Sequence, residues 1–91
     1  MSRNQISKES QEFGQWVKEL RLKNDLTQAE LSKALGMPGG FSQSIANIES
    51  GRVMLPYIKY GKAFCKALRV QEEELKRRLR AVEAAKVNSA F

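Results

Sequence analysis

Residues 27–51 read TQAELSKALGMPGGFSQSIANIESG, and this stretch predicts two short helices joined by a brief turn. The Thr27 hydroxyl can accept a hydrogen bond from the Glu30 amide while the Glu30 carboxylate reaches back to the Thr27 amide. This reciprocal cap marks the start of a helix. Gly36 is expected to end the same helix, because glycine readily adopts the left-handed conformation that closes a helix.

The second short helix carries isoleucines on one side and polar residues on the other. Ile45 and Ile48 are three positions apart and should both point inward. We expect Ser42 to cap this helix and Gly51 to end it as a left-handed residue. Two helices this short cannot bury their own apolar sides, so longer flanking helices must hold them.

Amphipathic helices are expected on both sides of this unit. On the N-terminal side, Phe13 and Val17 recur at helical spacing within a predicted helix over residues 8–23. On the C-terminal side, Pro56 suits the first position of a fourth helix. The apolar side of that helix is predicted to consist of Ile58, Gly61, Phe64, Cys65 and Leu68.

The last predicted helix covers roughly residues 71–86. Its Leu75, Leu79 and Val82 follow one another at helical spacing. These three side chains fit either the core of the monomer or a dimer seam. In the second interpretation they would be joined by Ala81, Ala84 and Ala85.

Composition excludes several classes of function. The chain has 91 residues, a net charge of +6 from 16 Lys+Arg against 10 Asp+Glu, no His and one Cys, which corresponds to one small domain. Without His and with a single Cys, no Cys/His zinc site, Ser-His-Asp or Cys-His nucleophile, or internal disulfide can form. We therefore expect no enzymatic activity, metal or cofactor, and no small-molecule ligand is evident.

The excess of positive charge favours a polyanionic partner, nucleic acid before a membrane surface. The chain has no apolar run resembling a signal peptide and none long enough for a membrane span. We expect a cytoplasmic protein that does not contact a membrane.

The polar side of the second short helix suits the major groove of DNA. With Ile45 and Ile48 inside, hydrogen-bonding side chains remain outside, where they can meet base edges. The outward residues are Ser42, Gln43, Ser44, Ala46, Asn47 and Ser50.

The segment from Lys18 to Gly51, with LTQAELSKALG followed by SIANIESG, resembles the Cro and phage-repressor (Xre-like) helix-turn-helix DNA-binding family. The continuation LPYIKYGKAFCKALRVQEEEL extends the resemblance through residue 75, so that it covers about two thirds of the chain. It implies an all-α, five-helix, lambda-repressor-like domain that binds double-stranded DNA.

The resemblance also implies roles for individual residues. Base readout falls to the start and outer side of the second short helix, at Ser42, Gln43, Ser44 and Asn47. Phosphate contacts fall to Thr27, Gln28, Ser50 and Arg52, and Gln28 is also expected to brace the recognition helix. Arg21 and Glu49 match an ion pair that ties the first helix to the third, which would also hold a carboxylate away from the DNA.

Two features depart from the family pattern. Between Gly36 and Glu49 the chain has three more residues than the usual turn, within MPGGF, so the recognition helix is expected to begin later or to tilt differently. Ser32 also occupies a position that the family usually gives to Ala. We expect its hydroxyl to bond back to the Gln28 carbonyl.

The expected function is that of a sequence-specific transcriptional regulator, a repressor that occludes a promoter, often its own. A single short recognition helix contacts few base pairs, so a homodimer on a palindromic operator is expected. The alternative is an antitoxin-like or other protein-interaction module that binds a partner protein, with DNA binding secondary. An RNA binder is not favoured, because the sequence lacks the exposed aromatic pair or glycine clamp of single-strand readers.

The predicted organisation follows from these assignments. Residues 1–7 form a flexible N-terminal arm and residues 8–70 the helix-turn-helix domain. Residues 71–87 form the C-terminal helix, a candidate for dimerisation, and residues 88–91 a tail.

Overall fold

The structure is a computed structural model that describes residues 7–89, with side chains placed through Ala85. Its elements are α1 (Lys8–Lys23), α2 (Gln28–Ala34), the short 3-10 helix η1 (Pro38–Gly40), α3 (Ser42–Glu49), α4 (Tyr57–Leu68) and α5 (Glu72–Ser89). The expected all-α fold with five α-helices is confirmed over this part of the chain. Most of the predicted N-terminal arm and the last two residues of the predicted tail, 90–91, lie outside the described residues.

Local capping determines where α2 begins and ends. The Thr27 hydroxyl accepts from the Glu30 amide at 3.0 Å, and the Glu30 carboxylate accepts from the Thr27 amide at 2.8 Å. This is the predicted reciprocal cap of α2. Gly36, with φ of 76°, supplies the left-handed residue just after that helix.

Two predicted helix starts are displaced by one residue. Phe41, not Ser42, occupies the cap position of α3, and its backbone is extended with φ of −83° and ψ of 143°. Ser42 is already helical, so the prediction that it caps α3 is wrong. Similarly, Pro56 has ψ of 104° and precedes α4, which begins at Tyr57. Helix α3 therefore begins one residue earlier than predicted and α4 one residue later, because the preceding turn ends at Phe41 in the first case and at Pro56 in the second.

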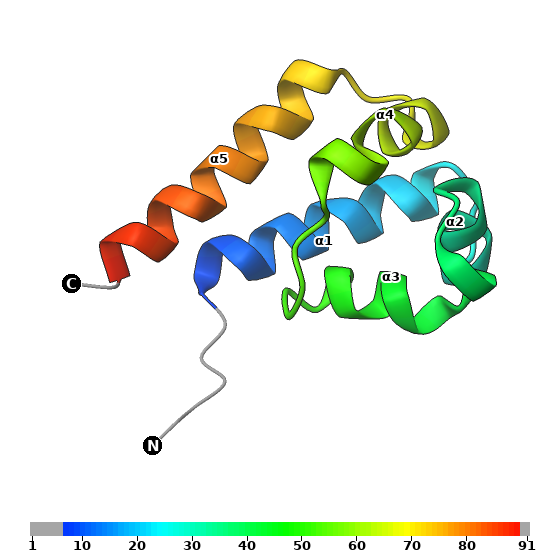
Figure 1. The fold of residues 1–91 in the computed structure, drawn as a ribbon, viewed down its shortest axis with the longest axis horizontal. Helices are drawn as coiled ribbons and strands as arrows, with labels where there is room; N and C mark the ends of the chain where they lie inside the picture. The colour runs from blue at the N-terminus through cyan, green and yellow to red at the C-terminus, as the bar shows by residue number, and fades with distance from the viewer. Residues whose placement is uncertain (1–6, 90–91) are drawn as a thin grey trace.

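Helix α1 lies between α3 and α5, whereas α2 and α4 lie near its C-terminal end (Figure 1). All five helices contribute to one core around α1. Its largest fully buried apolar side chains are Val17, Leu31, Ile45, Phe64, Leu68, Leu75 and Val82. Because α3 gives both of its isoleucines to this core, the orientation of its opposite side is determined by the whole bundle.

Helix α5 packs along α1 and α4, and this decides between the two interpretations of its apolar residues. Leu75 is 0% and Val82 is 2% exposed, and Leu79 is half-buried against the core. On the same helix, the Arg78 guanidinium covers the Trp16 ring at 4.4 Å from its centroid. Leu75 and Val82 complete the monomer core and are not available to a partner chain, in contrast to the predicted dimer seam.

Two other packing predictions are wrong. Ile58 is fully exposed instead of joining the apolar side of α4, and in the first turn of that helix it is Tyr60 that is buried. The Ser32 hydroxyl is buried with no hydrogen-bond partner, so its predicted bond to the Gln28 carbonyl is absent. Cys65 is a buried core residue, as predicted.

The starts of α4 and α5 are joined by a tyrosine. The Tyr57 hydroxyl donates to Glu72 Oε1 at 2.8 Å. This hydrogen bond to a carboxylate raises the pKa of Tyr57 above its ordinary value.

In the described part of the chain, the helices lack the combination of length and apolar character that a membrane crossing requires.

Candidate nucleic-acid interface

Helix α3 lies at the edge of the molecule, on the far side of α1 from α5 (Figure 1). Its inner side is fixed by Ile45 and Ile48, which are 1% and 2% exposed. Of the four predicted base-readout residues, Ser42 and Gln43 are exposed and Ser44 and Asn47 are half-buried: all four belong to this helix. The structure therefore carries all four on the helix at this accessible edge, although on different sides of it.

A hydrogen bond along α3 orients two of these residues. Gln43 Nε2 donates to Asn47 Oδ1 at 3.0 Å, one turn further along the helix. This bond uses one of the two N–H groups of the Gln43 amide and does not involve its Oε1. The amide of Gln43 is thus held in place while keeping donor and acceptor capacity for another partner.

Ser44 lies on a different side of the helix from Gln43. Together with Asn47 it lines a shallow groove of about 240 Å3 whose other lining residues are Met37, Pro38, Ile48, Val53, Pro56 and Tyr60. Ser44 therefore lies at the edge of the polar face and Gln43 at its centre.

The last residue of α3, Glu49, is directed into the protein. Arg21 donates from Nε to Glu49 Oε2 at 2.6 Å and from Nη2 to Oε1 at 3.3 Å, a two-point contact. The Arg21 and Glu49 side chains are only 9% and 6% exposed. Arg21 Nη1 also donates to the Leu26 carbonyl at 2.8 Å. The one carboxylate of α3 is thereby neutralised and turned away from the outer edge.

The predicted phosphate contacts lie around the C-terminal end of α3. Gln28 reaches it from the start of α2, where its Nε2 donates to Glu49 Oε1 at 3.0 Å. Thr27, exposed, precedes Gln28 as the cap of α2. Ser50 follows α3 and donates its hydroxyl proton to the Asn47 carbonyl at 3.0 Å, and Arg52 is exposed in the next loop. Residues from two distant segments thus converge at one end of the helix.

A glycine that the sequence pattern did not single out sets the position of α3. Gly14 is buried in α1, and a Cβ placed on it would lie 2.7 Å from the Ile48 carbonyl oxygen and closer still to that of Glu49. The backbones of α1 and α3 therefore touch at this point. The available signal was an isolated glycine in an otherwise helical pattern, which is typical of close packing.

Phe41 was also missed. It directly precedes α3, and 67% of it is exposed. It ends the longer turn that departs from the family pattern, in which Pro38–Gly40 form the short helix η1. An aromatic residue after two glycines was the only signal in the sequence.

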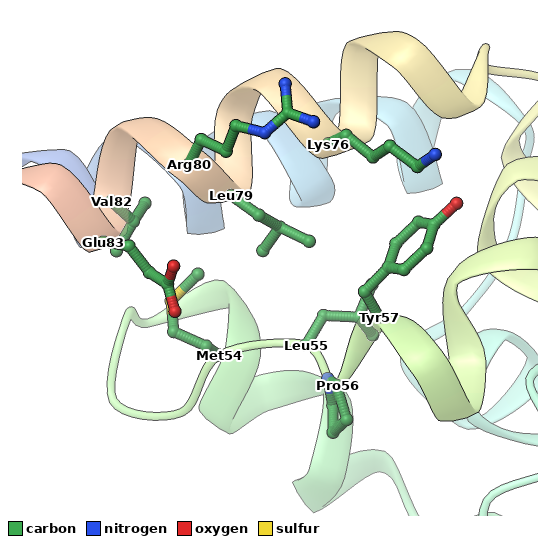
Figure 2. Close-up of a pocket in the computed structure, with 9 residues that line it drawn as sticks. All are labelled: Met54, Leu55, Pro56, Tyr57, Lys76, Leu79, Arg80, Val82 and Glu83. Carbon is green, nitrogen blue, oxygen red and sulfur yellow. The ribbon is translucent and has the colours of Figure 1, made fainter.

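A second groove lies between the α3–α4 loop and α5. It has a volume of about 410 Å3, and Leu79 points from α5 toward the loop that carries Met54 and Leu55 (Figure 2). Charged side chains also line it, namely Lys76, Arg80 and Glu83.

Over the described residues, no group of three His, Cys, Asp or Glu side chains is placed to hold a metal ion.

Comparison with known proteins points to one family. A family model described as Helix-turn-helix matches residues 17–75, well over half of the chain. The match runs from the middle of α1 into the first turn of α5 and includes the whole polar edge of α3. The chain matched no curated protein and no solved structure.

Proposed function

Because the chain belongs to the Cro and phage-repressor (Xre-like) helix-turn-helix family of DNA-binding regulators, we propose that it recognises a specific duplex sequence by placing α3 in the major groove. The observation that carries this proposal is the division of α3 into two sides. Ile45 and Ile48 fix it to the core, and Gln43 is presented outward. The carboxylate of Glu49, the last residue of α3, would repel phosphate, but it is paired with Arg21 inside the protein.

Base readout is proposed for Ser42, Gln43, Ser44 and Asn47. The Oε1 and second N–H of Gln43 match the N6 donor and N7 acceptor that adenine displays in the major groove. The hydrogen bond to Asn47 holds this amide before DNA arrives. Adenine is therefore the base we expect opposite Gln43.

Phosphate contacts are proposed for Thr27, Gln28, Ser50 and Arg52, which lie around the C-terminal end of α3. Such contacts fix the register of a helix in the groove without reading sequence. Gln28 combines this role with its hydrogen bond to Glu49, so it links the backbone contact to the recognition helix.

Substitution separates the two kinds of contact. Gln43→Ala is expected to weaken binding to the preferred duplex about 10-fold per half-site and to remove the preference for adenine at one position, since a bidentate contact of this kind discriminates between bases. Arg52→Ala is expected to weaken all duplexes alike and to reduce the salt slope of binding by about 1 for each Arg52–phosphate contact that is lost. Fluorescence anisotropy on a duplex selected from a random library, at several salt concentrations, measures both effects.

Gln15→Ala is a matched control for Gln43→Ala. Gln15 is also an exposed helical glutamine with a hydrogen bond one turn further along, to Glu19, but it lies on α1. Its substitution should leave affinity and sequence preference unchanged. Equal losses on every duplex for Gln43→Ala and Arg52→Ala would contradict the proposed division between base and phosphate contacts.

We further propose that the regulator is a homodimeric repressor that covers a promoter at a palindromic operator. One short helix reads too few base pairs to select a site alone. With Leu75 and Val82 in the core, the surface proposed for the dimer contact is the half-buried Leu79 and the adjoining groove on α5 (Figure 2).

Light scattering after size-exclusion chromatography should give twice the 10.3 kDa chain mass. The selected duplexes should contain inverted half-sites whose centres lie about 34 Å apart, one turn of DNA. A monomer mass with and without duplex, together with selected sites that lack symmetry, would contradict the dimer.

A further inference from the structure

The ring of Phe41 is not used by the core or by the cap of α3. The residue is 67% exposed although it is fully aromatic and apolar. It occupies the cap position of α3 but makes no side-chain hydrogen bond there. Ser, Thr, Asp or Asn at this position would cap the helix with a side-chain hydrogen bond, which phenylalanine cannot make. The role of this side chain therefore lies outside the folding of the monomer.

The ring nevertheless has a defined position. It lies against the backbone of Gly39 in η1, where an added Cβ would be 2.6 Å from ring atom Cδ2 and closer still to Cε2. Gly39 also has φ of 80°, in the left-handed region that favours glycine. The longer turn thus holds an exposed ring against the backbone of Gly39, directly before the first turn of α3.

The N-terminal residues of a recognition helix are the ones that reach base edges. In the major groove, the apolar group that a base pair displays is the C5-methyl of thymine, and phenylalanine is one of the side chains that contact it. Gln43, two residues after Phe41, suits the adenine edge. An A·T pair presents both features, so the ring and the amide at this end of α3 are suited to the same type of base pair.

We propose that Phe41 reads a thymine methyl beside the N-terminal end of α3 and is a specificity-determining residue of this protein. This inference rests on the proposed insertion of α3 into the major groove. It makes the longer turn, which departs from the family pattern, a device that adds one apolar base contact.

The probe is the duplex selected by the wild-type chain, in which each thymine in turn is replaced by deoxyuridine, which lacks only the methyl group. At one thymine per half-site, the replacement should weaken wild-type binding about 4-fold, which is the loss of affinity expected when one methyl group is no longer buried. Phe41→Ala should bind the thymine and uracil duplexes equally at that position. Fluorescence anisotropy gives both affinities, and circular dichroism verifies that the exposed substitution leaves the helices intact.

Two further variants make the test specific. Ile58→Ala removes another fully exposed apolar side chain, on α4, and should keep the 4-fold difference between the duplexes. Gly39→Ala keeps the phenylalanine but displaces its ring from η1. It should therefore reduce the difference between the duplexes although the aromatic side chain remains.

The inference is overturned by a wild-type chain indifferent to every uracil, or by a Phe41→Ala variant that keeps the full 4-fold difference. An unchanged affinity and selected sequence for Phe41→Ala would also overturn it. Each of these results is compatible with sequence-specific binding through Gln43. Failure of the proposed function is a different observation, namely that the wild-type chain selects no duplex sequence at all.

Discussion

Glu49→Ala is expected to lower the free energy of unfolding by about 3–5 kcal/mol, because it leaves a buried arginine without its counter-charge. Arg21 is 7% exposed, and its contact to Glu49 Oε2 is 2.6 Å long. A domain of this kind is stable by only about 5–15 kcal/mol in total. Urea denaturation followed by circular dichroism should show a large shift of the midpoint.

Two controls identify burial as the cause. Glu74 on α5 pairs with Arg77 and Arg78 at the surface, so Glu74→Ala should cost at most about 1 kcal/mol. The double variant Arg21→Met with Glu49→Leu should recover most of the lost stability, since apolar side chains of similar volume can replace a buried ion pair. A loss for Glu49→Ala as small as that for Glu74→Ala would contradict this account of the pair.

Gly14→Ala is expected to destabilise the protein by about 3 kcal/mol, the upper end of the usual cost of overpacking. Helix propensity alone predicts the opposite, a gain of about 1 kcal/mol from replacing glycine within a helix. The added Cβ would press on the carbonyl groups of Ile48 and Glu49, which are backbone atoms and cannot rotate away. Helix α3 must shift to make room, so DNA affinity should fall as well.

Gly61→Ala in α4 is the matched comparison. Gly61 is also a buried helical glycine, but its added Cβ would meet the Tyr57 side chain, 2.5 Å from Cδ1, instead of backbone. A side chain can turn aside, so this variant should lose less stability than Gly14→Ala. Thermal and urea denaturation of the two variants test this order. A Gly14→Ala protein as stable as wild type would show that the backbone contact between α1 and α3 leaves room for a methyl group.

Features that depend on neighbours within one or two helical turns could be predicted from the sequence. The span of α1, the reciprocal cap at Thr27 and the left-handed glycines at 36 and 51 are of this kind. Each follows from hydrogen bonds or backbone preferences between residues close in the chain. The inward side of α3 was predictable as well, since Ile45 and Ile48 fall on one helical face. The starts of α3 and α4 were misplaced by one residue because each depends on the turn before it.

The candidate site divides in the same way. Gln43 could be placed on an outward helical face from periodicity alone. Its hydrogen bond to Asn47 depends on side-chain orientations that a helical pattern does not specify. The exposure of Phe41 likewise depends on the path of η1 and on the contact of the ring with Gly39.

By itself, the sequence determined the approximate spans of the five α-helices, where the helix-turn-helix unit lies and which side of α1 and α3 is apolar. Only the tertiary structure decided that Leu75 and Val82 belong to the monomer core, that Ile58 does not, and that Gly14 is a contact between two backbones. The physical reason is that periodicity specifies an apolar face but not the surface that covers it. That partner comes from segments far apart in the chain, and it is identified only when the helices pack.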